Sequence, residues 1–125
     1  MEVNELRVGN FVWEEYGGLY EVININSEGF GYVDLRKPTF KCIGRYEIGS
    51  VKPIPLTKEW LLKLGIQYSD FEGLFQIGGY DIDAKDGSYC HFYFNEYGDW
   101  YKEIEYVHQL QNLYFALTGE ELKLK

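Results

Sequence analysis

His108 and the amides around it are the first residues in this sequence whose types and spacing could do chemistry. In YVHQLQNLYFALTG, His108 precedes Gln111 and Asn112 by three and four residues, so on a helix these side chains share one face. An imidazole can act as an acid, a base or a ligand, but no Cys, Ser or carboxylate pair stands nearby in the sequence. We therefore predict no catalytic residue here. We expect a solvent-facing binding patch that includes Gln109.

A second group of candidate residues lies in YCHFYFN. Strand alternation assigns these residues to opposite faces, with Tyr89, His91 and Tyr93 on one and Cys90, Phe92 and Phe94 on the other. The Cys/Phe side is the predicted core. The outward residues, together with Trp100, are predicted to bind a partner, because aromatic rings bury much area at low entropic cost. An equally supported alternative is that the rings form cross-strand pairs that stabilise the sheets.

Metal and cofactor motifs are not found. DIDAKDG has clustered aspartates, but the glycine and glutamate of a calcium-binding EF-hand loop do not fall at the required positions. Cys42 and Cys90 form no CxxC pair, and the chain has two histidines in all. We predict no cofactor and no metal. A small hydrolase or nuclease using His108 is an alternative that would require His91 and an acid such as Asp83 to converge on it.

The composition indicates a folded, acidic protein. The 125 residues suit a single domain, 18% are aromatic, and 20 Asp and Glu against 12 Lys and Arg give a net charge of −8. Such a surface repels phosphate, so direct nucleic-acid binding is not expected. Solubility is the simpler explanation of the acidity, and an acidic decoy that inhibits a DNA-binding host enzyme is the alternative. No apolar run approaches the roughly 18 residues of a membrane span, and we expect a cytoplasmic protein without membrane attachment.

Hydrophobic periodicity predicts an α+β fold. Gly-punctuated strands over about 3–54 predict a small antiparallel curled sheet or an SH3-like barrel. A short helix at 57–64 is predicted to begin at Thr57 and end at Gly65, and a β-meander follows it. The stripe Val107, Leu110, Tyr114 and Leu117 predicts a C-terminal helix that ends at Gly119, with the stripe buried and His108 outward. We expect one domain over 1–125, and a division into subdomains 1–55 and 56–125 is left open. Whether 120–125 is a strand or a tail is left open.

Three stretches together resemble a known family. LRVGNFV, KPIPLTKEWLLKLG at 52–65 and YVHQLQNLYFALTGEEL at 106–122 are similar to small proteins encoded by phages and mobile elements of anaerobic gut bacteria. In that family the motifs IPLTEEWLLKFGF and VHQLQNLYFALTGEEL recur, and Leu64 stands where the first motif has Phe. The resemblance implies an intracellular accessory protein, gives no activity, and implies that the patch around His108 matters to the family. The opening LRVGNFVWEEYGGLYEVININ is also similar to the start of an SH3-like barrel.

These observations favour a non-enzymatic binding or adaptor module of a phage or mobile element. Its partner is expected to be a protein of unknown identity, and the oligomeric state is left open. If the helix patch faces solvent, changing His108, Gln111 and Asn112 to Ala should weaken partner capture. The free energy of unfolding should then change by no more than about 1 kcal/mol.

Overall fold

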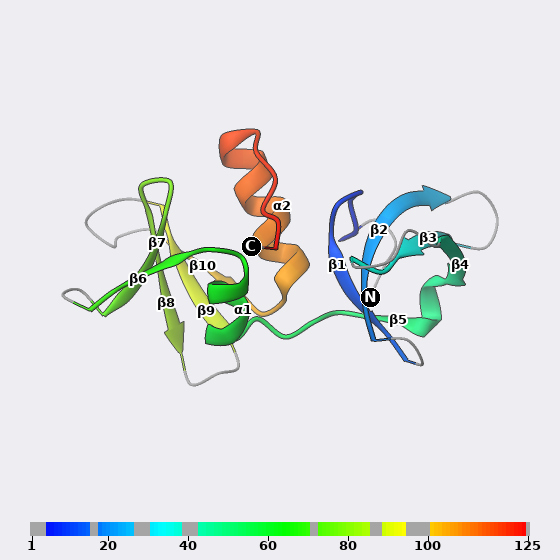
Figure 1. Ribbon diagram of the computed structural model, residues 1–125. Helices are drawn as coiled ribbons and strands as arrows, with labels where there is room; N and C mark the ends of the chain where they lie inside the picture. The colour runs from blue at the N-terminus through cyan, green and yellow to red at the C-terminus, as the bar shows by residue number, and fades with distance from the viewer. Residues whose placement is uncertain are drawn as a thin grey trace. The chain divides into compact units, whose positions relative to one another are not determined.

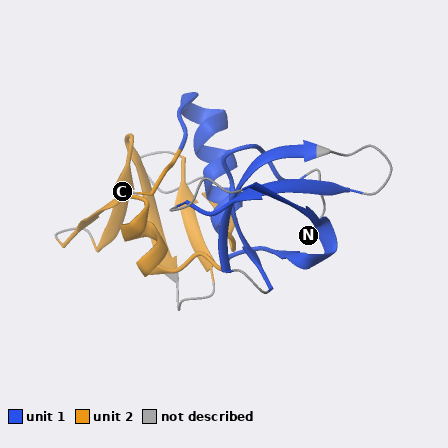
Figure 2. Ribbon diagram, turned by 45° about the vertical axis from the view of Figure 1, so that its right-hand side comes forward, with its two compact units in different colours: residues 1–54, 107–121 blue, residues 55–106, 122–125 orange. Residues whose placement is uncertain are grey.

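A computed structural model describes residues 5–15, 18–26, 31–38, 43–70, 73–85, 89–94 and 101–124 of the chain. The fold is α+β, as predicted, with two antiparallel five-stranded sheets, a short helix and a C-terminal helix (Figure 1). The chain divides into two compact units. Unit 1 comprises Met1–Ile54 and Val107–Glu121, and unit 2 comprises Pro55–Tyr106 and Leu122–Lys125 (Figure 2).

Unit 1 contains the first sheet, which has the strand order β4-β3-β2-β1-β5. Its strands are β1 (Phe11–Glu14), β2 (Gly18–Asn26), β3 (Tyr32–Arg36), β4 (Ile43–Glu47) and β5 (Val51–Lys52). A 3-10 turn at Ile48–Ser50 separates β4 from β5. Because β4 and β5 are edge strands in the described part of the chain, the sheet is open, which is consistent with the predicted curled sheet and not with a closed SH3-like barrel.

A β-bulge in β2 shifts the inward–outward alternation of its side chains. Tyr20 and Val22 are buried, and strict alternation would place Asn24 beside them. The pairing with β3 shifts between Val22 and Asn24, so that Asn24 is exposed and Ile25 packs against the core. The bulge therefore keeps a polar side chain out of the apolar interior.

Unit 2 contains the second sheet, which has the order β10-β9-β8-β7-β6. Its elements are α1 (Lys58–Lys63), β6 (Gln67–Ser69), β7 (Leu74–Ile77), β8 (Tyr80–Lys85), β9 (Tyr89–Tyr93) and β10 (Tyr101–Ile104). The predicted N-cap of α1 is confirmed, since Thr57 Oγ1 accepts the Trp60 N–H at 3.3 Å. Gly65 ends the helix with φ +78°, a conformation that favours glycine. The predicted β-meander is confirmed, and in the described residues it comprises β6 to β10.

The C-terminal helix α2 (Val107–Thr118) belongs to unit 1 and contacts β1. Gly119 follows it with φ +77°, as predicted. Residues 120–124 form no strand, and Leu122 is buried. None of the helices in the described ranges is long and apolar enough to cross a membrane. The turns expected at Gly17, 27–29, Asp86-Gly87 and 96–99 lie outside the described residues.

Candidate functional site

The polar side chains of α2 do not face solvent as a group, contrary to the sequence-based expectation. Val107, Leu110 and Tyr114 are buried as predicted, but Leu117 is 38% exposed. His108 and Gln111, expected to face outward, are 1% and 0% exposed. Gln109 and Asn112 are half-buried. The buried stripe of the helix therefore includes two polar residues.

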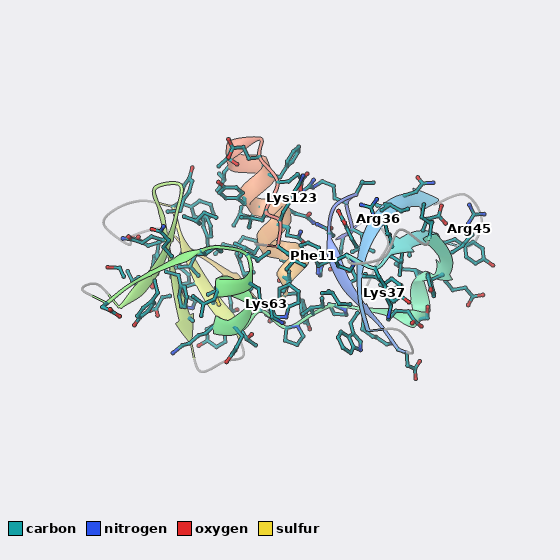
Figure 3. The ribbon with its side chains drawn as sticks, in the orientation of Figure 1. Phe11, Arg36, Lys37, Arg45, Lys63 and Lys123 are labelled. Atoms are coloured by element: carbon teal, nitrogen blue, oxygen red, sulfur yellow. The ribbon has the colours of Figure 1, made fainter. Side chains whose placement is uncertain are left out.

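Gln111 is buried because its amide satisfies two backbone groups beside β1. Its Oε1 accepts the Phe11 N–H at 2.8 Å, and its Nε2 donates to the Gly9 carbonyl at 2.9 Å. Strand β5 pairs with β1 only at Trp13 and Glu14, so Gln111 supplies the partner that a longer strand would give to Phe11. Figure 3 labels Phe11 on the side of β1 that faces α2. Burial of a polar amide is tolerated when both of its functions are bonded in this way.

Asn10 and Asn112 extend this arrangement, and with Gln111 they form what we term the amide anchor. The fully buried Asn10 accepts the Arg7 N–H through Oδ1 at 2.7 Å and donates through Nδ2 to Asn112 Oδ1 at 2.8 Å. Asn112 Nδ2 in turn donates to the Glu5 carbonyl at 2.9 Å. The anchor thus joins α2 to the turn that precedes β1.

Arg7 contacts the C-terminal half of α2 and the residue Glu121 after it through its guanidinium group. Its guanidinium lies over the Phe115 ring, 4.1 Å from the ring centroid. It also forms an ion pair with Glu121 and donates to the Gln111 carbonyl at 3.3 Å. Gly9 lies beside Glu121 with φ +100°, and a Cβ there would come within 3.3 Å of the Glu121 carboxylate. The stretches 6–12 and 107–121, both part of the resemblance noted above, therefore meet in unit 1.

His108 belongs to the interior. Burial lowers the pKa of its imidazole, an effect that the Glu5 carboxylate partly opposes. A buried, neutral imidazole of this kind is unsuited to the solvent-facing binding patch that the sequence suggested.

The second group of predicted residues lies on one face of the sheet in unit 2. Tyr89, His91 and Tyr93 are all partly exposed on β9, whereas Cys90 and Phe92 are buried on its other face, as predicted. Phe94, expected in the core, follows the end of β9 and is 37% exposed. Burial raises the pKa of the Cys90 thiol to about 11, with a smaller contribution from Asp83. Trp100 lies outside the described residues.

Strand register adds acidic and aromatic neighbours that the sequence pattern did not assign to this group. Residues directly opposite one another in an antiparallel sheet point to the same side. One row across the sheet comprises Asp81, Tyr93 and Tyr101, and the next comprises Asp83, His91 and Glu103. We term these two rows, with Tyr89, the aromatic–acidic face. Gln76 continues the first row and donates to Asp81 at 3.3 Å.

The rings of this face contact one another. His91 stacks on Tyr101 with centroids 4.3 Å apart and planes 23° apart. Tyr89 and Tyr93 lie 5.4 and 6.2 Å from the His91 centroid, and Tyr93 is tilted by 54° to Tyr101. Cross-strand pairing thus accounts for part of the role of these rings, yet Tyr101 remains 55% exposed. The cross-strand interpretation therefore accounts for part of the packing of these rings, and partner binding stays a prediction.

The aromatic–acidic face has an imidazole between two carboxylates, and none of the residues assigned to it is a Ser, Thr or Cys. His91 and Asp83 belong to unit 2, whereas His108 belongs to unit 1. Among the described residues no three His, Cys, Asp or Glu side chains are grouped so that they could hold a metal ion.

Sequence reasoning missed several residues that matter to either group. The sequence did not point to Asn10, Arg7 or Glu121. The Gly9-Asn10 pair is nevertheless a turn signal, and the positive φ of Gly9 marks a bend whose polar groups require hydrogen-bond partners. Tyr101 and Glu103 are not among the residues that the sequence pattern predicts either, because their register with His91 is a long-range property.

Comparison with protein families, with curated proteins and with solved structures gives no match to this chain. The resemblance to small phage and mobile-element proteins therefore stays a prediction.

Proposed function

We propose that this chain is a non-enzymatic protein-binding module and that its contact surface is the aromatic–acidic face of unit 2. The observation that carries the proposal is the exposure of clustered rings on a sheet face whose opposite side already forms the core. Cys90 and Phe92 supply apolar burial on that opposite side, so the sheet does not need Tyr101 for its interior. Clustered Tyr side chains with partly exposed neighbours are typical of protein contact surfaces.

The amide anchor has a different role in this proposal. Its hydrogen bonds hold α2 against the turn before β1, and we assign to it the maintenance of unit 1. The family resemblance implies that the stretch around His108 matters. In this proposal it matters because it stabilises the fold of unit 1, and not because it contacts a partner. An adaptor role for a phage or mobile element remains consistent with a small module of this kind.

Tyr101→Ala tests the contact surface, with Tyr68→Ala as its matched control. The two tyrosines are 55% and 49% exposed on the same sheet, but Tyr68 pairs with Phe75 and so points to the opposite face. Tagged full-length variants would be used to capture proteins from host lysate, followed by quantitative mass spectrometry. Proteins retained by the wild type should be lost with Tyr101→Ala and kept with Tyr68→Ala. Equal retention by both variants would refute this surface.

A further inference from the structure

Strand β4 lies at one end of the first sheet and has an open edge. Among the described residues, β3 is the only strand that pairs with it (Figure 1). The pairing is regular over Ile43–Glu47, and the strand contains neither a bulge nor a proline. Bulges and prolines are among the features by which proteins prevent an edge strand from pairing with another chain. The backbone of β4 is therefore suited to receive a further strand.

The hydrogen-bond pattern determines which backbone groups point toward the open edge. The Ile48 N–H donates to the Gly31 carbonyl at 2.9 Å, in the same register that pairs β4 with β3. Bonded and non-bonded residues alternate along an antiparallel pair, so the even-numbered residues of β4 bond to β3 as Ile48 does. The N–H and carbonyl groups of Arg45 and Glu47 therefore point to the open edge. Ser50 Oγ donates to the Glu47 carbonyl at 2.8 Å, and a carbonyl oxygen has a second lone pair for another donor.

The two residues whose backbone groups point to this edge carry opposite charges. Arg45 and Glu47 are both exposed, and 58% of the Arg45 side chain is accessible. Arg45 contacts Asp34 through Nε at 3.0 Å, which leaves the two terminal nitrogens of its guanidinium for a second carboxylate. An antiparallel copy of β4 can supply that carboxylate, because in such a pair the charges of one strand run opposite to those of the other.

Only one symmetric register of two β4 strands places these opposite charges together. A two-fold axis at Tyr46 sets Arg45 of each copy opposite Glu47 of the other, and each such pair exchanges both of its backbone hydrogen bonds. An axis at Arg45 would set two arginines opposite one another, and an axis at Glu47 would set two glutamates opposite one another. Like charges directly opposite are destabilising. The charges therefore favour the axis at Tyr46.

We propose that two copies of this chain form a symmetric dimer by pairing their β4 strands about Tyr46, so that the first sheet continues from one copy into the other. Tyr46 is half-buried and packs against the core of unit 1. In the dimer the two Tyr46 side chains lie directly opposite one another and lose further exposure to water. The proposal concerns unit 1 and is independent of the contact surface proposed for unit 2.

Sedimentation velocity of the full chain tests the proposal, because a dimer becomes populated as the concentration rises. One strand pair is smaller than a standard interface of about 1,600 Å², so we expect a dissociation constant in the micromolar range. Measurements from about 5 to about 500 µM should show the monomer mass rising toward twice its value. A concentration of about 150 mM NaCl screens the repulsion between two chains of net charge −8.

Glu47→Pro separates edge pairing from folding. Glu47 has φ −70° and ψ 142°, which are close to the angles that proline adopts in extended chains, and its N–H points away from β3. Proline should therefore fit the isolated chain while removing a donor and a charge from the open edge. The urea midpoint of this variant should stay close to that of the wild type, and the variant should remain monomeric over the whole concentration range.

Charge reversal tests the register. Glu47→Arg and Arg45→Glu each place like charges opposite one another, so each variant alone should raise the dissociation constant of the dimer at least tenfold. An equimolar mixture of the two variants should restore dimerisation, because opposite charges then meet in both pairs. Both variants remain acidic overall, so general attraction does not explain such a recovery. Glu120→Arg, at an exposed position in the same unit, should change the dissociation constant by less than twofold.

A wild-type chain that stays monomeric up to about 500 µM would overturn the proposal. Persistence of the dimer in Glu47→Pro would also overturn it, as would a mixture of the two folded charge variants that associates no better than either alone. Circular dichroism shows whether each variant is folded. If Arg45→Glu unfolds because it repels Asp34, the comparison of Glu47→Arg with Glu120→Arg decides, and equal dimerisation by these two would refute the register.

Discussion

Replacing Gln111 with Leu should destabilise unit 1, because the change removes both hydrogen bonds of a fully buried amide while nearly keeping its volume. The Phe11 N–H and the Gly9 carbonyl each lose a partner. A buried backbone group left without a partner costs about 1–3 kcal/mol, and since Gly9 is only partly buried the two together cost at most about 6 kcal/mol. The added apolar burial of leucine offsets about 1–2 kcal/mol of that cost. We expect a net loss of about 3 kcal/mol, a large share of the roughly 5–15 kcal/mol typical of a domain.

Urea denaturation followed by circular dichroism measures this loss. With a slope of about 2 kcal/mol per molar urea, the midpoint should fall by about 1.5 M. Gln67→Leu is the control, since Gln67 is an exposed amide on β6 and should change the unfolding free energy by less than about 0.5 kcal/mol. A Gln111→Leu midpoint equal to that of the control would refute the role assigned to the amide anchor. This larger loss replaces the sequence-based expectation for the free energy of unfolding. That expectation was a change of at most about 1 kcal/mol for alanines at His108, Gln111 and Asn112.

Two further predictions concern buried titrating groups. Because burial keeps the pKa of His108 below its ordinary 6.5, the unfolded chain binds the proton first, and the free energy of unfolding should fall as the pH drops below about 6.5. Urea midpoints between pH 7.5 and 5.5 should show this slope in wild type and in His91→Leu but largely lose it in His108→Leu. A thiol pKa of about 11 leaves about one thiolate in a thousand at pH 8, so Cys90 in a Cys42→Ser variant should react with a disulfide reagent far more slowly than free cysteine. Labelling at the rate of free cysteine would contradict its burial.

Local signals in the sequence were sufficient for much of the fold. The cap at Thr57, the helix ends at Gly65 and Gly119, and the buried stripe through Val107, Leu110 and Tyr114 follow from short-range patterns. Alternation likewise separated Cys90 and Phe92 from the outward side of β9. These features depend on residues within a few positions of one another, which a sequence displays directly.

Properties set by distant residues were not predictable in the same way. Polar side chains on a helix usually face water, and burial of Gln111 is favourable because its amide bonds the Phe11 N–H and the Gly9 carbonyl beside β1. The bulge that turns Asn24 outward and Ile25 inward depends on the register between β2 and β3, which composition does not reveal. The acidic neighbours of His91 depend on the register of β8 and β10, which the turns and long-range packing determine.

The amide anchor has a consequence for the order in which the chain matures on the ribosome. Gln111 meets Phe11 across a separation of 100 residues. At roughly 5–20 residues per second, β1 to β5 leave the ribosome several seconds before the helix that must complete them. During that interval water must solvate the Phe11 N–H and the Gly9 carbonyl, and the nascent sheet keeps an open edge. The first strands to be synthesised therefore belong to a unit that is completed only after the C-terminal helix has been made.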